Sequence, residues 1–319
     1  MERGTVLVTG GNSGIGLECA RVLARQGRGV LIASRDRAAS AAAVERITTE
    51  TGNPNVSEMG LDLGSFYSIR RFARRIEADD VPLQALVCNA GVQFSGGLRL
   101  SSDGFELTFA VNHLGHFLLT QLLIDRLAAN APSRIVVVAS GVHDPARWSG
   151  MPKPAIADFE TLAASGGARA GAYNGQLAYV NSKVCNMWFC YELARRIEEE
   201  RVARNAERIT VNAFDPGLVP GSGLARDYSP AQRWIWDRVL PRVARLLTGA
   251  VPSISTAAKS GDALARLVLD PTLAQVSGKY FPSHRRWQEA PSSKESYDLA
   301  RARELWDESL RMCGIAARG

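Results

Sequence analysis

Tyr179 and Lys183 are the residues of this sequence whose types and spacing point most directly to chemistry. They stand four positions apart in a segment predicted to be helical over 176–203, so both side chains lie on one face of the helix. An ammonium group beside a phenol stabilises the phenolate and lowers a pKa that is ordinarily about 10. The pair could therefore give or take a proton near neutral pH. Because a Tyr-x-x-x-Lys arises by chance in roughly one chain in ten of this composition, a second signal is needed.

The second signal is the segment Thr9–Gly16, which reads Thr-Gly-Gly-Asn-Ser-Gly-Ile-Gly. The apolar run 5–8 before it predicts a buried strand, and the pattern over about 15–26 predicts a helix. Glycines at such a turn let the backbone approach a pyrophosphate, whose charge the helix N-terminus binds. A tight turn also needs glycine for steric reasons alone, so it is the strand before and the helix after that indicate a dinucleotide site.

The end of the next predicted strand, 30–33, bears on the choice of dinucleotide. An acidic residue directly after this strand would bind both ribose hydroxyls of NAD(H). The chain has Ser34 and Arg35 there instead. Because arginine carries a permanent charge on a planar fork of donors, this pair suits a 2′-phosphate, and we expect NADP(H) rather than NAD(H). The alternative is that Arg35 is an ordinary surface residue, and the nearby Asp36 counts against phosphate binding.

Apolar runs alternate with helical patterns along most of the chain. The predicted strands are 5–8, 30–33, 56–61, 83–88, 134–139, 209–214 and 279–281, and the predicted helices are 15–26, 37–50, 65–78, 103–129 and 176–203. This alternation predicts an α/β fold, a doubly wound parallel sheet of the Rossmann type that binds ligands beyond the carboxyl ends of its strands. We expect one domain over 1–319, with a cofactor half of about 1–140 and a catalytic and substrate half of about 141–319. Two long stretches, 141–175 and 216–252, are predicted to be irregular, and the second to form a helical substrate lid.

Several motifs together resemble the short-chain dehydrogenase/reductase family. They are the Thr9–Gly16 turn, Asn89-Ala90-Gly91, Asn112, Ser140 and Tyr179-x-x-x-Lys183, and they span nearly the whole chain. Two further runs resemble one branch of that family, which holds retinol-dehydrogenase-like enzymes and light-dependent protochlorophyllide reductases. These runs are Asn112–Phe117, Asn-His-Leu-Gly-His-Phe, and Ser182–Met187, Ser-Lys-Val-Cys-Asn-Met.

The resemblance implies a catalytic set of Asn112, Ser140, Tyr179 and Lys183. In this set Tyr179 is the general acid or base, and Lys183 lowers its pKa while donating to the nicotinamide ribose. Ser140, at the carboxyl end of the predicted strand 134–139, donates a hydrogen bond to the substrate oxygen. Asn112 holds a water that links the lysine to solvent. Each residue also has a structural interpretation: a strand-end cap for Ser140, a polar helix residue for Asn112 and packing for Tyr179.

The resemblance also implies contacts along the whole dinucleotide. Asp62 and Leu63 would meet the adenine, although Asp62 fits equally well as the cap of a helix that begins near Ser65. The segment Asp215–Val219 would lie along the nicotinamide, with Ser222 in place of the usual threonine at the carboxamide. The expected cofactor residues are Gly10, Asn12, Ser13, Gly14, Ile15, Gly16, Ser34, Arg35, Asp62, Leu63, Asn89, Ala90, Gly91, Tyr179, Lys183, Pro216, Gly217, Val219 and Ser222.

These expectations favour an enzyme that reduces a ketone or aldehyde with NADPH, or runs the reverse alcohol oxidation. The lid offers apolar surface for a bulky lipophilic substrate, from Leu224, Tyr228, Trp234, Ile235, Trp236, Val239, Leu240 and Val243. One alternative is light-dependent reduction of a chlorin C=C bond. Against it stands Leu218, where protochlorophyllide reductases carry cysteine. A second alternative is a scaffold or sensor that binds NADP(H) without turnover, which the intact catalytic set disfavours.

Composition and charge exclude several other classes of function. The net charge is +6, but the arginines are interleaved with acidic residues and form no aromatic-rich basic stripe, so nucleic-acid binding is not expected. The five cysteines form no Cys-x-x-Cys, and His113 and His116 are interpreted as packing, so neither disulfides nor a metal are expected. A strand begins within five residues and no long apolar run follows, so we expect a cytoplasmic protein. The arginines of the predicted lid are compatible with peripheral contact with a membrane surface and no more. The family resemblance is compatible with a homodimer that forms through 103–129 and 176–203.

Overall fold

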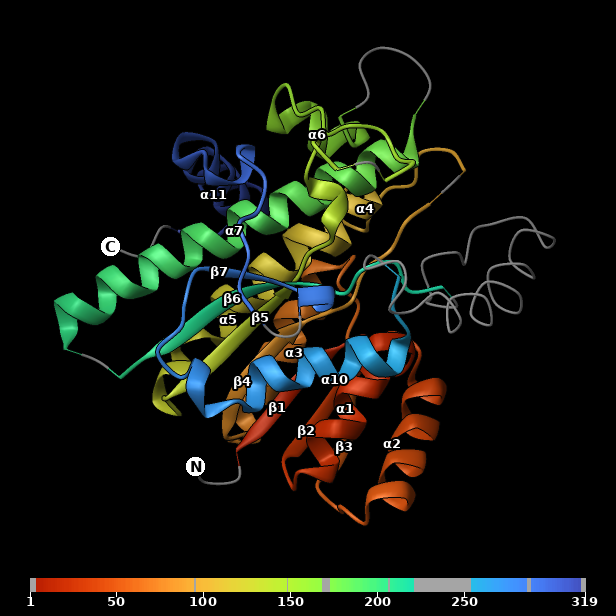
Figure 1. Ribbon diagram of the computed structural model, residues 1–319, viewed down its shortest axis with the longest axis vertical. Coiled ribbons are helices and arrows are strands. Elements are labelled where there is room, and N and C mark those ends of the chain that lie inside the picture. The colour runs from red at the N-terminus through yellow and green to blue at the C-terminus, as the bar shows by residue number, and fades with distance from the viewer. Residues whose placement is uncertain are drawn as a thin grey trace.

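Short runs of apolar, β-branched residues form a parallel sheet at the centre of the molecule (Figure 1). The computed structural model describes residues 4–94, 96–147, 149–167, 173–205, 207–220, 254–285 and 288–316. Within these ranges the strand order is β3-β2-β1-β4-β5-β6-β7, and every ladder is parallel. The strands are β1 Thr5–Thr9, β2 Gly29–Ser34, β3 Val56–Gly60, β4 Leu83–Cys88, β5 Ser133–Val138, β6 Ile209–Asp215 and β7 Lys279–Pro282. Each lies within one residue of its predicted bounds at either end.

The order of the strands reverses direction between β1 and β4, and in such sheets the ligand crevice opens there, beyond the carboxyl ends. Helices cover both faces of the sheet (Figure 1). On one face, α1 Gly14–Arg25, α2 Arg37–Thr51 and α10 Ala257–Leu269 enclose an apolar cluster built on Val8, Ile32 and Val87. On the other face lie α3 Phe66–Ala78, α5 Gly115–Ala129, α7 Gly175–Arg204 and α11 Leu299–Cys313. The predicted doubly wound sheet is therefore confirmed.

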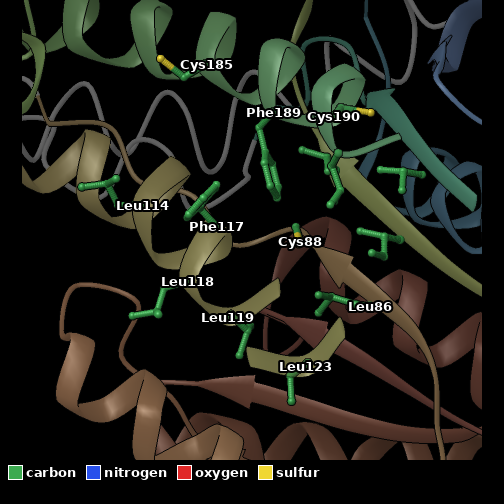
Figure 2. Packing of buried hydrophobic residues seen from close by; sticks show 14 of the residues in the cluster. Leu86, Cys88, Leu114, Phe117, Leu118, Leu119, Leu123, Cys185, Phe189 and Cys190 are labelled. Atoms are coloured by element: carbon green, nitrogen blue, oxygen red, sulfur yellow. The ribbon is translucent and has the colours of Figure 1, made fainter. Parts of the chain in front are cut away.

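The second face carries the larger core. Figure 2 shows Phe117 of α5 and Phe189 of α7 turned toward each other above Cys88, and their ring centroids are 5.7 Å apart. By length and composition alone, the helical stretch Leu107–Ala129 could cross a membrane, but most of it is buried inside the fold. Its apolar character is thus explained by the core between the sheet and α7.

The prediction of one continuous helix over 103–129 is wrong, because the helical stretch begins later and is interrupted by a π-helical turn. It begins at Leu107 because the buried Glu106 caps it, accepting hydrogen bonds from the backbone N–H groups of Thr108 at 2.9 Å and Phe109 at 2.6 Å. One short α-helical piece, α4 Leu107–Phe109, is followed by a π-helical turn, Ala110–Leu114, and then by α5. Such π-turns are uncommon and concentrate at functional sites.

The stretch 141–175, predicted to be irregular, contains α6 Phe159–Ser165, and two helices were not predicted at all, α10 and α11. The lid predicted at 216–252 lies outside the described residues beyond 220, and with it all the apolar lid residues and Ser222. The predicted substrate lid therefore stays a prediction.

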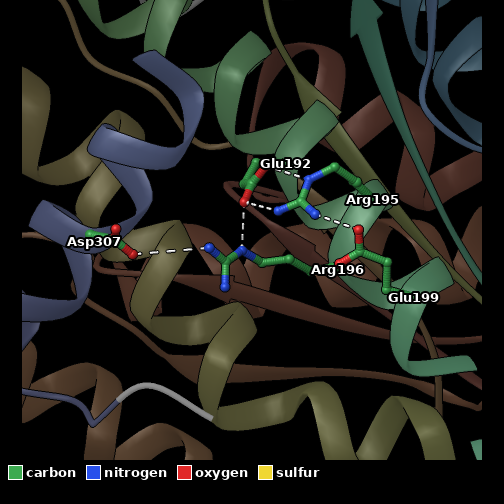
Figure 3. Close-up of polar contacts among 5 residues, drawn as sticks. All are labelled: Glu192, Arg195, Arg196, Glu199 and Asp307. Carbon is green, nitrogen blue, oxygen red and sulfur yellow. Dashed lines mark hydrogen bonds and ion pairs between the residues drawn. The ribbon is translucent and has the colours of Figure 1, made fainter. Parts of the chain in front are cut away.

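The C-terminal helix α11 packs against α5 through an aromatic contact and against α7 through a cation–π contact and an ion pair. Trp306 packs edge-on against Phe117 with ring centroids 5.0 Å apart, and the Arg196 guanidinium stacks 4.6 Å from the Trp306 ring centroid. Figure 3 shows Arg196 between the buried carboxylate of Glu192, at 2.6 Å, and Asp307 of α11, at 3.9 Å. α11 thereby covers part of the α5 and α7 surfaces that the family resemblance left open to a homodimer.

Candidate active site and cofactor cleft

The turn between β1 and α1 is shaped by close backbone approach. Gly10 and Gly14 have φ of +64° and +55°, the left-handed region that favours glycine. A Cβ at Gly16 would lie 2.5 Å from both the Gly10 carbonyl oxygen and Asn89 Nδ2, so a side chain there would force the turn apart. Ser13 provides no side-chain cap to α1. Gly14, Ile15 and Gly16, the first residues of the helix, line the cleft, as a pyrophosphate site at a helix N-terminus requires.

The hydroxyl of Thr9 joins this turn to the end of β4. It accepts hydrogen bonds from the backbone N–H groups of Asn89 at 2.9 Å and Ala90 at 3.0 Å. His116 Nε2 lies 2.9 Å from the same oxygen, while His116 Nδ1 lies 3.1 Å from the Asn112 carbonyl oxygen. Since a carbonyl can only accept, Nδ1 carries the proton and Nε2 accepts from Thr9. Burial lowers the pKa of His116 to about 4, which keeps the ring neutral in this role.

Asn112 stands in the π-helical turn, completely buried, and acts as a brace between three segments. Its Oδ1 accepts from the Val92 backbone N–H at 2.8 Å, and its Nδ2 donates to the Val92 carbonyl and to Ser182 Oγ, both at 3.0 Å. A Cβ at Gly91 would lie 3.4 Å from Asn112 Oδ1 and 3.9 Å from Lys183 Nζ, so the three residues converge. The water predicted for Asn112 stays a prediction. The Asn112 side chain is hydrogen-bonded to the backbone of Val92, in the loop after β4.

Ser140, Tyr179 and Lys183 line the same cavity as the glycine turn. Ser140 follows β5 and begins the short 3-10 helix Gly141–His143. Tyr179 and Lys183 project from α7, with Lys183 Nζ 5.5 Å from the Tyr179 ring centroid. Lys183 Nζ also donates to the Val138 carbonyl oxygen at 3.0 Å, which holds it at the end of β5. The hydroxyl, the phenol and the ammonium thus face one end of one cleft.

The charge state of Lys183 is set by two opposing effects. Burial lowers the pKa of this lysine to about 8, and the negative charge of Asp215 acts against that fall. A group with this pKa is mainly protonated at neutral pH. A buried ammonium so close to a phenol is an arrangement that favours phenolate formation on Tyr179.

The same cavity extends to the end of β2, where Ser34, Arg35 and Asp36 line it. Asp36 is occupied as the N-cap of α2, accepting from the Ala39 N–H at 2.9 Å. Arg37 pairs with Glu58 at 2.8 Å, whereas Arg35 is exposed and reaches the cavity. The Asp36 carboxylate is therefore directed to the helix, so it is a weaker objection to phosphate binding than the sequence suggested.

Asp62 and Leu63 line the cavity beside β3, and the alternative role for Asp62 as a helix cap is wrong. Ser65 caps α3, accepting from the Ser68 N–H at 3.3 Å, while Asp62 Oδ1 accepts from the Gly64 N–H at 2.9 Å in a tight turn.

At the opposite end the wall is formed by residues that follow β6. Pro216, Gly217 and Val219 line it, and Gly217 has a φ of +73°. All the expected cofactor residues other than Ser222 thus surround a single cavity; Asn112 lies behind its wall rather than on it.

Comparisons with known proteins show the family of this chain. Residues 4–149 match the family model described as short chain dehydrogenase. Human retinol dehydrogenase 13 is 38% identical over 313 residues, covering 98% of this chain and 85% of the relative. The chloroplastic protochlorophyllide reductase of Daucus carota is 34% identical over 334 residues, covering 99% of this chain and 79% of the relative. The chain belongs to the short-chain dehydrogenase/reductase family. A crystal structure of an uncharacterized protein from Mycobacterium paratuberculosis superposes with a TM-score of 0.70 at 28% identity, covering 99% of this chain and 96% of that one.

Membership of the short-chain dehydrogenase/reductase family makes the protein an oxidoreductase and confirms the resemblance drawn from its motifs. Four residues around the site were not singled out from the sequence for the roles they have here. Thr9 and His116 connect the glycine turn to the π-helical turn, and Asp215 and Tyr280 lie behind the Pro216–Gly217 wall. Their partners are distant in the chain, so no local pattern marks them.

Proposed function

We propose that this protein reduces a ketone or aldehyde with NADPH, with Tyr179 as the proton donor. The observation that carries the proposal is the convergence of Ser140, Tyr179 and the buried Lys183 on one end of the cleft that begins at the glycine turn. A bound nicotinamide dinucleotide would supply hydride chemistry at that end. The cleft suits such a group because glycines line it at the turn after β1, where a Cβ at Gly16 would stand 2.5 Å from the Gly10 carbonyl oxygen and from Asn89 Nδ2.

In the proposed reaction the side chains handle the substrate oxygen and the proton. Ser140 donates a hydrogen bond to the carbonyl oxygen and stabilises the negative charge that develops as the carbon is reduced. Tyr179 transfers its phenolic proton to that oxygen, giving the alcohol, and becomes a phenolate. Lys183 stabilises the phenolate through its ammonium charge. A proton from solvent then restores Tyr179, and alcohol oxidation follows the same steps in reverse.

We propose NADP(H) as the cofactor because Arg35 reaches the cavity at the adenosine end while Asp36 and Arg37 are engaged elsewhere. The Ser34 hydroxyl lies 2.7 Å from Ser40 Oγ and also faces this cavity. An exposed guanidinium beside a hydroxyl fits a phosphate ester on the ribose better than two bare hydroxyls.

We propose a bulky lipophilic substrate. The two relatives are named for retinol and protochlorophyllide, both large and largely apolar molecules, and both are similar to this chain over nearly its whole length. Protochlorophyllide reduction under light is the second candidate, favoured by that same 34% identity. Leu218 argues for the carbonyl reaction, because a leucine offers no ionisable group next to Gly217. The Leu218 side chain is 51% exposed.

The test is NADPH consumption in the dark with a panel of hydrophobic ketones and aldehydes, repeated with NADH and with protochlorophyllide under illumination. Dark turnover that prefers NADPH would support the carbonyl reductase. Turnover only with illuminated protochlorophyllide would support the second candidate. NADPH binding without turnover in either assay would instead favour a scaffold or sensor.

A further inference from the structure

Asp215 is a buried carboxylate behind the cleft, with an exposed fraction of 3%. It is the last residue of β6, directly before the Pro216–Gly217 wall. Its Oδ1 accepts from the Gly217 backbone N–H at 2.9 Å, and its Oδ2 accepts from the Tyr280 hydroxyl at 2.9 Å. Asp215 therefore fixes the turn that forms one wall of the cleft.

A buried carboxylate needs compensating positive charge, and the compensation here is incomplete. Arg147 Nη1 lies 3.6 Å from Asp215 Oδ2, and the Arg147 side chain is 40% exposed. Gly141 lies between these two groups, since a Cβ there would stand 2.9 Å from each. Arg147 is thus an ion-pair partner beyond hydrogen-bond distance and partly in solvent, which leaves part of the Asp215 charge to act on other groups nearby.

Lys183 is a buried cation at the neighbouring strand end, because Val138, whose carbonyl oxygen binds Lys183 Nζ, pairs in the sheet with Phe214, the residue directly before Asp215. It is anchored by the Val138 carbonyl at 3.0 Å, a neutral acceptor. The ionisable groups around it within the described residues are Tyr179 on its own helix, His116 on α5 and Asp215 on β6. Burial lowers the pKa of His116 to about 4, so His116 adds no charge in the working pH range.

On the far side, Asp215 faces Tyr280 of β7 and His143 of the turn after Ser140. Burial raises the pKa of Tyr280 far above its usual range and lowers the pKa of His143. Both groups are therefore neutral near pH 7. Asp215 is then the one negative charge that opposes the loss of the Lys183 proton among the groups that the structure describes.

We propose that Asp215 is a positioning residue for proton transfer, which keeps Lys183 protonated through its charge and holds the Pro216–Gly217 turn through the Gly217 N–H. This inference rests on the proposed function, since the charge on Lys183 matters only where Tyr179 must pass a proton. It assigns two separable tasks to one carboxylate. The charge acts on Lys183, and the oxygen acceptor acts on the turn.

The test is a titration of Lys183 by NMR in the full chain with [13Cε]-lysine. The sequence has five lysines, so the Lys183 signal can be assigned by its loss in Lys183→Arg. Asp215→Asn removes the charge but keeps an oxygen that can accept from the Gly217 N–H. We expect it to lower the Lys183 pKa by about one unit. The exposed Asp262 of α10 provides the matched control, Asp262→Asn, which should leave the Lys183 pKa unchanged.

A change of less than about 0.2 units in Asp215→Asn would overturn the inference, because a nearby opposite charge shifts a pKa by more than that. If Asp215→Asn does not fold, the pair Arg147→Met and Arg147→Met/Asp215→Asn makes the same comparison in the absence of the Arg147 charge. Lys183 should titrate lower in the double variant, and equal pKa values there would also overturn the inference.

Two further readouts separate the two tasks. In Asp215→Asn the alkaline limb of the pH profile of kcat/KM should move to lower pH, because Lys183 loses its proton earlier. Uniformly lower activity with an unmoved limb would instead indicate a merely structural role. Asp215→Ala should in addition weaken NADPH binding by loosening the turn. The NMR titration needs no substrate, so a wild-type protein without carbonyl turnover would refute the proposed function and leave the Lys183 result standing.

Discussion

Thr9→Val removes one hydroxyl and keeps the shape of the side chain, so it tests the connection between β1, β4 and the π-helical turn. In the wild type the fully buried Thr9 hydroxyl accepts from the Asn89 and Ala90 N–H groups and donates to His116 Nε2. The variant leaves the Ala90 N–H and His116 Nε2 without this partner, whereas the Asn89 N–H keeps its hydrogen bond to the Val87 carbonyl oxygen at 2.9 Å. An unsatisfied buried polar group costs about 1–3 kcal/mol. Because His116 is buried and Ala90 is only partly buried, we expect a total loss of about 2–4 kcal/mol in the free energy of unfolding.

The assay is equilibrium unfolding in urea followed by tryptophan fluorescence, with NADPH affinity measured in parallel. Thr9→Ser is the matched control, since it keeps the hydroxyl and loses only a methyl group, at a cost of about 1 kcal/mol. We also expect weaker NADPH binding in Thr9→Val alone, because Ala90 and the glycine turn both line the cleft. Equal stability of the two variants would show that the hydroxyl does not hold the strand ends together.

Three other predictions concern single side chains. Arg35→Ala should weaken NADPH binding about tenfold to a hundredfold and leave NADH binding nearly unchanged. The control is Arg37→Ala, which should alter the binding of neither cofactor because the Arg37 guanidinium is paired with Glu58. Equal losses of NADPH and NADH affinity in Arg35→Ala would contradict a 2′-phosphate role. Gly16→Ala should fold but bind NADPH at least about tenfold more weakly in a fluorescence titration, because the added Cβ would stand 2.5 Å from the Gly10 carbonyl oxygen. An unchanged Kd would refute the need for close backbone approach at this turn. Burial alone would raise the pKa of Glu192, but hydrogen bonds from Arg195 and Arg196 together lower it. This carboxylate therefore stabilises the fold fully at pH values above its unfolded pKa of about 4.3. Its contribution to stability is lost as the pH falls through the lower pKa that it has in the folded protein. Glu192→Gln should therefore cost about 1–3 kcal/mol at pH 7 in urea unfolding and progressively less in acid, and a loss that does not depend on pH would contradict the ion-pair explanation.

The strands and the glycine turn could be predicted from the sequence because their signals are local. Most strands are short apolar runs, and the turn needs glycine where φ is positive, as at Gly10 and Gly14. The missed helices α10 and α11 also had local signals. In α11 the buried residues Leu305, Trp306 and Leu310 follow helical spacing behind the cap Asp298, so a stricter count of periodicity would have found this helix.

Other features depend on contacts between distant residues and leave no local pattern. The π-helical turn places Asn112 against Val92 and Ser182, neither of which is near it in the chain. The sequence suggests Asp62 as a cap of α3, and only the structure shows that Ser65 takes that role. The tasks of Asp215 likewise depend on Tyr280 and Lys183, which come from different elements of the fold.

The most direct measurement is the dark rate of NADPH oxidation with the best ketone or aldehyde, in the wild type and in Tyr179→Phe. The substitution removes only the hydroxyl, so NADPH affinity should change little while the rate falls by about two to four orders of magnitude. Ser140 and Lys183 remain in place in this variant, which makes the loss specific to the proton donor. A Tyr179→Phe rate close to that of the wild type would show that Tyr179 is not the acid and would contradict the proposed mechanism.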